Sequence, residues 1–409
     1  MPGFNRVGLP LLRTRRARRT RRARCTQGVL RVLAALALFL SPGAVSAELT
    51  SSLTIRVYTS AFYSGDSADS VPIEVAPVLR SSLYMDSTGN QNVKGYFQLD
   101  AWIADSLAFD IPRAYLKVRF PSFRLTLGKT RVSWGDGFVF NAGDVLFGSM
   151  GAISGDLSSE TLRAETGWLG AVNLPVGAFS FLEAVVVPYS LPAPIGSLET
   201  DLSFPADTVT FDQLSGGIRG VFKLGATTLE TGYFVSGRKA EHRPYLSLHG
   251  YFLADWNLSA SMAVPMFDPS WQRWGHWLAI SAGVFRQFKV GPDRDLSLRL
   301  EAGIRPGSLW QEETGAEAIP VTSPEAPVYG IYLFPDLAVP LSDTLSLQVR
   351  SMISPVDLSA LSVAGVSWNI YQGLEIYSHL SVMTGDANDL YSLDQRGSLN
   401  WTAGLEFIY

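Results

Sequence analysis

Apolar side chains occupy every second position at the end of this chain. Trp401, Ala403, Leu405, Phe407 and Tyr409 alternate with Asn, Thr, Gly and Glu. Because the side chains of a β-strand point alternately to its two faces, the pattern predicts a strand with one apolar and one polar face. Such a terminal strand is typical of a closed barrel in lipid, where an open sheet edge would leave backbone groups without hydrogen bonds.

The same alternation recurs along most of the sequence and defines about 18 candidate strands. Their length suits a tilted crossing of a bilayer, which takes roughly 9–11 residues. We expect them near residues 52–61, 76–85, 92–104, 110–120, 123–133, 161–173, 178–188, 214–224, 228–238, 244–254, 257–265, 275–288, 295–305, 328–339, 344–353, 359–370, 374–384 and 397–409. The stretch 244–265 can hold two strands or a strand and a loop, so 16 strands is the alternative.

Short and long connections alternate in a way that identifies the two ends of the barrel. The even connections are short, as at 121–122, 174–177, 225–227, 340–343 and 371–373, whereas every long one is odd: 62–75, 134–160, 189–213, 306–327 and 385–396. A soluble β-sandwich gives no reason for this parity. The chain is therefore predicted to be all-β, a transmembrane antiparallel up-and-down barrel with short periplasmic turns and long extracellular loops.

The first 47 residues have the features of a secretory signal peptide. Ten arginines lie between Arg6 and Arg31, and an apolar run and the small-residue site Val45-Ser46-Ala47 follow. We expect cleavage after Ala47, export to the outer membrane, and a barrel domain over 48–409. The only cysteine, Cys25, lies in the signal region, so no disulfide framework is expected.

Charge excludes one broad class of partner. Without the ten signal-region arginines the chain keeps 23 basic residues against 37 acidic ones. Binding to nucleic acid needs a basic surface that neutralises phosphates, so we expect no nucleic-acid partner. We also see no metal-ligand cluster, no catalytic residues and no cofactor motif.

Basic residues concentrate on two neighbouring predicted strands. Arg113, Lys117 and Arg119 share the polar face of the first strand, and the second strand places Arg124, Lys129 and Arg131 close to them. The bases that we expect to line the pore are Arg113, Lys117, Arg119, Lys129 and Arg131. If this face lines a lumen, the bases attract anionic solutes, because a low-dielectric wall focuses their field. The alternative is that the charges pair across strands with acids such as Asp100, Glu165, Glu230 and Glu301.

The long connection after Ser133 is too apolar to extend freely into water. It contains Trp134-Gly135-Asp136-Gly137 and a second turn-rich run from Asn141 to Asp144. We expect it to fold inward and narrow the pore, with Asp136, Asn141 and Asp144 at the constriction. A surface loop that caps the barrel is the alternative, and the spacing of these oxygen ligands fits no standard calcium loop.

The run LTLGKTRVSWGDGFVFNAGDVLFG, Leu125 to Gly148, resembles a strand-and-loop signature of bacterial outer-membrane porin-like barrels, including the alginate-export type and related uncharacterised families. With 113–120, the resemblance covers about 36 residues. It implies that Gly128, Lys129 and Trp134 to Asp144 form a strand end and an in-folded loop, although such families often have arginine in place of Lys129. The aromatic end at Tyr409 resembles the signal that the barrel-assembly machinery recognises.

The favoured function is a channel for passive diffusion of small hydrophilic solutes, with anions as the candidate preferred class, and not an enzyme. The first alternative is a structural or interaction barrel closed by its loops, and a homo-oligomer is an open possibility. A hydrolase is the remote alternative, since His379 and Ser381 share a strand face but the expected Asn-Gly does not follow. Tryptophans 271, 274 and 277 suit a membrane girdle better than a sugar site.

Overall fold

The computed structural model describes residues 48–63, 73–90, 92–104, 107–148, 165–188, 214–237, 239–267, 274–292, 294–305, 330–386, 389–394 and 397–409. The expected signal peptide, most of the long connections 189–213 and 306–327, and Trp271 lie outside these residues. Among the described residues no helix is long and apolar enough to cross a membrane.

One antiparallel sheet contains every strand of the described chain. In order, the elements are β1 (Glu48–Tyr63), β2 (Ile73–Asn90), β3 (Val93–Ile103), β4 (Leu107–Arg119), β5 (Arg124–Thr130), β6 (Gly167–Pro175), β7 (Phe181–Val187), β8 (Ser215–Leu224), β9 (Thr227–Ser236), β10 (Glu241–Phe252), β11 (Ala254–Met262), β12 (Val264–Pro265), α2 (Trp274–Trp277), β13 (Leu278–Lys289), β14 (Asp295–Ile304), β15 (Ile331–Pro340), β16 (Leu345–Ser354), β17 (Ser359–Tyr371), β18 (Leu374–Met383) and β19 (Leu399–Ile408).

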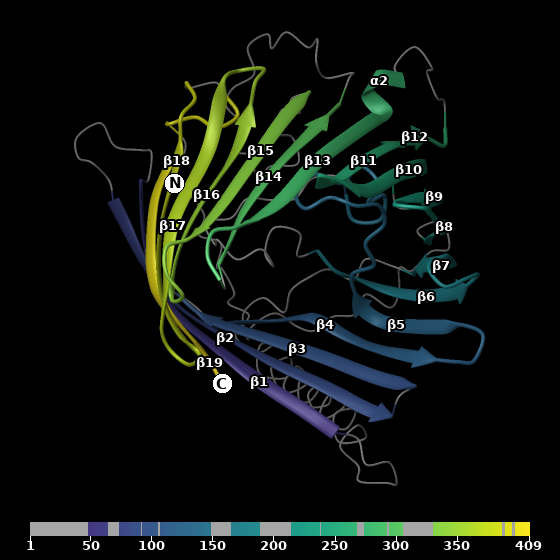
Figure 1. Cartoon of the computed structure of the whole chain (residues 1–409), viewed down its shortest axis with the longest axis horizontal. Coiled ribbons are helices and arrows are strands. Elements are labelled where there is room, and N and C mark those ends of the chain that lie inside the picture. Colours follow the sequence, from purple (N-terminus) through teal and green to yellow (C-terminus); the bar gives the residue numbers. More distant parts are fainter. Residues whose placement is uncertain are drawn as a thin grey trace, which may run out of the picture.

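The sheet closes on itself. Thr54 to Phe62 of β1 pair with Asn400 to Ile408 of β19, so the first and last strands lie side by side, purple next to yellow in Figure 1. β12 is not a separate strand of the barrel. It continues the pairing of β11 with β10, through Glu241 and His242 of β10. The remaining strands form the expected closed 18-strand antiparallel barrel, and the 16-strand alternative is wrong because β10 and β11 are separate strands that meet at Leu253.

Apolar side chains form the outer face of this wall. Val57, Ile218 and Leu300 expose 51%, 64% and 54% of their surface, and Leu405 and Phe407 of the last strand are exposed in the same way. Such a continuous apolar exterior is stable against acyl chains and not against water, because a soluble monomer rarely exposes large apolar patches. The alternation of β19 that the sequence shows therefore separates a lipid face from an inner face.

The parity of the connections agrees with the expected orientation. The even connections are tight, as at Pro121-Ser122, at Gly225-Ala226 and at Gln372-Gly373. Gly225 and Gly373 have φ values of +63° and +77°, which glycine adopts without the steric cost of a Cβ atom. The other end of the barrel carries the long connections, and the first described one of these, after β5, turns into the ring of strands (Figure 1).

Candidate functional site

Residues 131–148, called the inner loop here, pack against the inner face of the barrel. Trp134, Val139 and Asn141 have no exposed surface, and Phe140 has 2%. Their partners come from strands β7 to β16, so this loop lines about half of the wall from inside. The expected inward fold of this segment therefore agrees with the burial of its described residues.

Two glycines let the loop make its first turn. Gly135 has φ +68° and Gly137 has φ +151°. A Cβ atom at Gly137 would lie 2.0 Å from the carbonyl oxygen of Phe140, and one at Gly135 would lie 2.6 Å from Asn141 Oδ1. Both glycines of the Trp-Gly-Asp-Gly motif are therefore required for two reasons: their positive φ angles and the lack of space for a Cβ atom.

Glu230 on β9 anchors the beginning of the inner loop. Its Oε1 atom accepts hydrogen bonds from Gly135 N at 2.7 Å and from Arg219 Nη1 at 2.9 Å, and it also accepts the Tyr245 hydroxyl. Arg219 in turn contacts Glu183 at 2.9 Å and donates to the carbonyl of Ser133. A buried carboxylate is stable only when it is paired and hydrogen-bonded, and this network meets that requirement.

Glu301 on β14 anchors the middle of the loop. Oε1 accepts Phe138 N at 2.8 Å, and Oε2 accepts Val139 N at 2.7 Å and Phe140 N at 3.0 Å. Arg299 lies 3.4 Å from Oε1 and stacks over the Phe138 ring with 3.9 Å between guanidinium and ring centroid. Three consecutive backbone donors therefore end on one carboxylate, which fixes the backbone as a helix N-terminus holds an anion.

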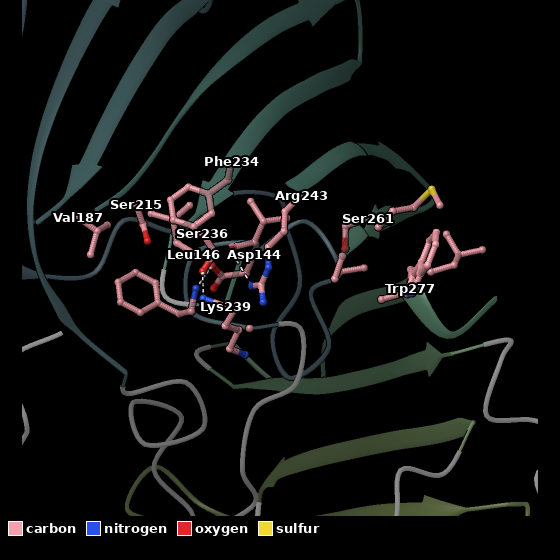
Figure 2. A pocket seen from close by; sticks show the side chains of 18 of the residues that line it. Asp144, Leu146, Val187, Ser215, Phe234, Ser236, Lys239, Arg243, Ser261 and Trp277 are labelled. Atoms are coloured by element: carbon pink, nitrogen blue, oxygen red, sulfur yellow. Dashed lines mark hydrogen bonds between the residues drawn. The ribbon is translucent and has the colours of Figure 1, made fainter. Parts of the chain in front are cut away.

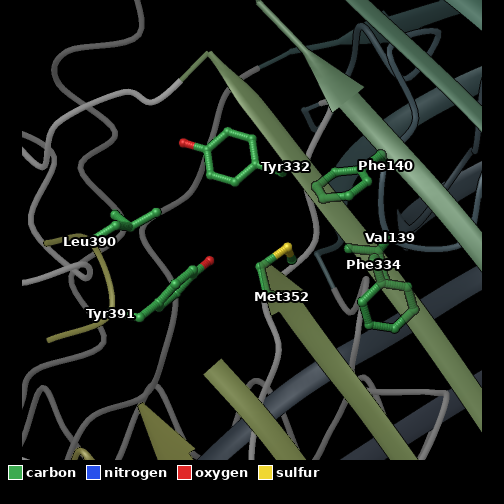
Figure 3. Packing of buried hydrophobic residues seen from close by; sticks show 7 residues of the cluster. All are labelled: Val139, Phe140, Tyr332, Phe334, Met352, Leu390 and Tyr391. Atoms are coloured by element: carbon green, nitrogen blue, oxygen red, sulfur yellow. The ribbon is translucent and has the colours of Figure 1, made fainter. Parts of the chain in front are cut away.

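Apolar packing completes the attachment at the far end. Val139 and Phe140 join Tyr332, Phe334 and Met352 of β15 and β16, together with Leu390 and Tyr391 from the connection between β18 and β19, as Figure 3 shows. The glycine at position 303 makes room for this packing, because a Cβ atom there would lie 2.9 Å from the Phe140 ring. The inner loop and the segment 389–394 thus share one buried cluster.

Asp357, in the turn between β16 and β17, holds the segment 389–394. It accepts Leu390 N at 2.8 Å and the Ser359 hydroxyl at 2.9 Å. Partial burial raises the pKa of Asp357, but hydrogen bonds from Ser354, Leu390 and Ser359 outweigh it, so the pKa lies below the ordinary aspartate value. Burial also raises the pKa of the Tyr391 phenol, aided by nearby Tyr332 and Asp357.

The expected loop acids occupy different environments. Asp144 is 1% exposed and forms an ion pair with Arg131, which also contacts Glu165 at 2.8 Å. Asn141 donates from Nδ2 to the carbonyl of Trp134. Only Asp136 exposes much of its carboxylate, which receives Gly137 N at 2.9 Å. The expected field of two acids across the lumen is thus reduced to Asp136, because Arg131 neutralises Asp144 directly.

The predicted bases divide into paired and exposed groups. Lys129 lies 3.5 Å from Asp110, and Arg131 is bound as described above. Arg113 interacts with the Tyr96 and Tyr115 side chains. Lys117 and Arg119 are exposed, and no ion pair to a described residue involves them.

Cross-strand register extends the exposed group. Lys117 lies opposite Lys94, and Arg119 lies opposite Arg124. Arg124 is opposite Asn173, which is opposite Glu183, and Glu183 accepts the indole N–H of inner-loop Trp134. These bases therefore share the inner face. We call Lys94, Lys117, Arg119 and Arg124 the basic wall. It lines a cavity of about 400 Å³ toward the end of the barrel that carries the short connections.

A second cavity, of about 740 Å³, lies along β1 to β4 and β19. Its charged lining residues include Arg113 and Asp86 and two ion pairs, Arg80 with Asp100 and Arg56 with Glu406. The inner loop contributes no residue to either cavity. These two cavities thus lie mainly along β1–β5 and β19, and no inner-loop residue lines them.

Sequence reasoning missed the residues that position the loop. Glu230 and Glu301 were expected only as possible partners of lumen bases, yet they bind loop backbone. The one available signal was a strand with a single charged residue, an acid, near its centre, as for Glu230 in 227–236. Lys94 was also missed, because it precedes the stretch 113–148.

Other chemistries find little support among the described residues. No group of three or more His, Asp or Glu side chains lies close enough to hold a metal ion. His379 and Ser381 do share the inner face of β18, but both are buried, and the Ser381 hydroxyl donates to the carbonyl of Asn400.

Comparison with known proteins places the fold but not a family. The sequence matches no protein-family model and no curated protein. Among solved structures, the barrel is similar to Acinetobacter baumannii OccAB4 (10% identity, TM-score 0.53, 90% of this chain and 100% of that one). It is also similar to Pseudomonas aeruginosa OccD3 (11%, 0.51, 90% and 92%) and to Acinetobacter baumannii OccAB1 (10%, 0.50, 90% and 98%). These likenesses show the fold, a closed all-β antiparallel barrel of 18 strands.

Proposed function

We propose that this protein is an outer-membrane diffusion channel for small hydrophilic solutes and that it favours anions. The observation that carries the proposal is the basic wall: four exposed bases on adjacent strands, with no ion pair to a described residue, beside open space that the inner loop leaves free. A cluster of like charges on a low-dielectric wall concentrates counter-ions and raises their rate of entry.

The balance of charge along the open side supports the sign of the preference. Arg56 and Arg80 are paired with carboxylates, so they add little net field. Lys94, Lys117 and Arg119 have no such partner among the described residues, and Arg113 adds a further base deeper in the lumen. The resemblance of the inner loop to the alginate-export type is part of the same proposal. It supports a barrel that a loop narrows from within, and it does not identify the solute.

The remaining expectations join this proposal. A signal peptide ending at Ala47 delivers the chain to the outer membrane, the strand ending at Tyr409 is read by the barrel-assembly machinery, and a homo-oligomer is compatible with the apolar exterior. The second candidate function is a barrel closed by its loops, favoured by the buried cluster that joins the inner loop to 389–394.

Single-channel recording in planar bilayers separates the two. We expect discrete conductance steps and, under a salt gradient, a reversal potential on the anion-selective side. Neutralising Lys117, Arg119 and Arg124 together to Gln should shift that potential toward zero or cation preference. Arg294→Gln, a base that pairs with Asp343 at a periplasmic turn, is the control and should leave it unchanged.

Folded protein that gives no steps refutes the channel and leaves the closed barrel. Steps with unchanged selectivity in the triple variant keep the channel and refute the anion preference.

A further inference from the structure

The basic wall places charges of the same sign directly opposite one another. Lys94 on β3 lies opposite Lys117 on β4, and Arg119 on β4 lies opposite Arg124 on β5. All four side chains are exposed. Residues directly opposite in an antiparallel pair have Cβ atoms about 4.5–5.5 Å apart, and like charges in such a pair destabilise the sheet. Two such pairs therefore cost the barrel stability, and an anion bound between the bases offsets that cost.

The two pairs are neighbours along one strand. Lys117 and Arg119 are two residues apart on β4, so they point to the same face with a rise of about 6.5 Å between them. One anionic group fits between the bases of one pair, and a second group of the same molecule reaches the other pair. A solute with a single charge relieves only one of the two repulsions.

The carboxylates near the basic wall are placed so that they do not neutralise it. Among the described residues, none forms an ion pair with its four bases. Glu183 lines the same cavity, but Arg219 binds it at 2.9 Å. Asp86 lies opposite Tyr96 and lines the neighbouring cavity. The repulsion within the two pairs is therefore left for a solute to relieve.

The charges of another cavity are arranged differently. Residues 142–148 of the inner loop help to line a cavity of about 580 Å³, drawn in Figure 2, that shares no lining residue with the cavity at the basic wall. Its Arg243 binds Glu241 at 2.6 Å, and its Asp144 is bound by Arg131. Acids and bases neutralise each other there, whereas at the basic wall bases face bases.

From this arrangement we infer that the basic wall is a binding site for polyvalent anions, in which two acidic groups of one solute bridge the two pairs of bases. Each acidic group makes charge-assisted hydrogen bonds to Lys or Arg, which are roughly twice as strong as neutral ones. The cavity of about 400 Å³ is large enough, since pockets for small organic molecules measure roughly 300–1,000 Å³. Polyvalent anions are then the preferred solutes of the barrel, a role that rests on the proposed channel function.

Equilibrium dialysis against the barrel in nanodiscs compares glutarate with its monoamide. At about pH 7.5 both carboxylates of glutarate are ionised, whereas the monoamide keeps the shape and only one charge. Salt at about 0.15 M screens charges more than about 8 Å away, so the comparison reports the groups at the site. We expect glutarate to bind at least about tenfold more tightly, because its second carboxylate makes charge-assisted hydrogen bonds that the amide lacks.

Two variants with the same charge locate the site. Arg119→Gln/Arg124→Gln removes one pair, so glutarate should bind no more tightly than the monoamide. Lys223→Gln/Arg294→Gln is the matched control: Lys223 lies opposite Thr228 and lines a cavity next to the basic wall, and Arg294 binds Asp343 in a short connection. It removes two bases but neither pair, and should leave the preference for glutarate unchanged.

Equal binding of glutarate and the monoamide by the wild type refutes the polyvalent site and leaves the channel standing. An undiminished preference in Arg119→Gln/Arg124→Gln, or an equal loss in the control, refutes its location. Should the first variant fail to fold, Lys94→Gln/Lys117→Gln removes the other pair and gives the same decision. A barrel without conductance that still prefers glutarate in this pattern contradicts the proposed channel and supports the site.

Discussion

Replacing Glu301 by Gln should loosen the middle of the inner loop without unfolding the barrel. The amide keeps one acceptor oxygen, so if that oxygen retains the two N–H groups now on Oε2, the N–H of Phe138 faces an NH₂ group. One buried donor without an acceptor costs about 1–3 kcal/mol, and the loss of charge assistance on the other two bonds adds about 1 kcal/mol each. The attachment of this stretch should therefore weaken by about 3–5 kcal/mol.

Hydrogen exchange read by mass spectrometry measures that loss. At 1.36 kcal/mol for each factor of ten, the amides of residues 138–140 should exchange about 160 to 5,000 times faster. Glu406→Gln makes the same chemical change on β19, where the carboxylate binds Arg56 and not the loop, and should leave these amides protected. Equal protection of 138–140 in the two variants would show that the Glu301 carboxylate does not hold the loop.

Three further predictions concern single residues. Gly128→Ala should lower the thermal stability of the barrel more than Gly148→Ala in a heat-modifiability gel assay, because both have φ +129° but only at Gly128 does a Cβ atom meet a backbone oxygen, at 2.2 Å. Trp134→Ala should cost about 3–5 kcal/mol of stability and lower the transition temperature in the same gel assay, because the fully buried indole packs against Tyr245 and Phe234. Asp357→Asn should remove the exchange protection of 389–394 and its pH dependence; in the wild type, protection given by this low-pKa carboxylate persists above the unfolded-state pKa and is lost as pH falls through the lower folded value.

The two-residue period of the strands and the alternation of short and long connections could be read from the sequence, because both are local properties of the chain. Each strand needs only its own alternation, and the contrast between short and long connections follows from chain order. A barrel of about 18 strands was therefore predictable, whereas the pattern at 244–265 fitted either two strands or a strand and a loop. The alternation of Trp401 to Phe407 likewise identified the lipid face of β19 before any contact was known.

The pairing of charged side chains was much harder to predict from the sequence. Arg131 and Asp144 are 13 residues apart, and nothing in their spacing shows that they bind each other rather than facing across a lumen. Glu301 reaches backbone donors more than 160 residues away, so its role depends on which strand the inner loop meets after it turns inward.

By itself, therefore, the sequence determined the closed antiparallel wall, its lipid face, the polar interior and the concentration of bases on β4 and β5. Only the tertiary structure decided which bases remain exposed on that interior, which carboxylates hold the inner loop, and which strands border the cavities that this loop does not line. The physical reason is that side-chain direction along a strand is set by neighbouring residues, whereas desolvation and pairing of a charge depend on groups that folding brings together from distant parts of the chain.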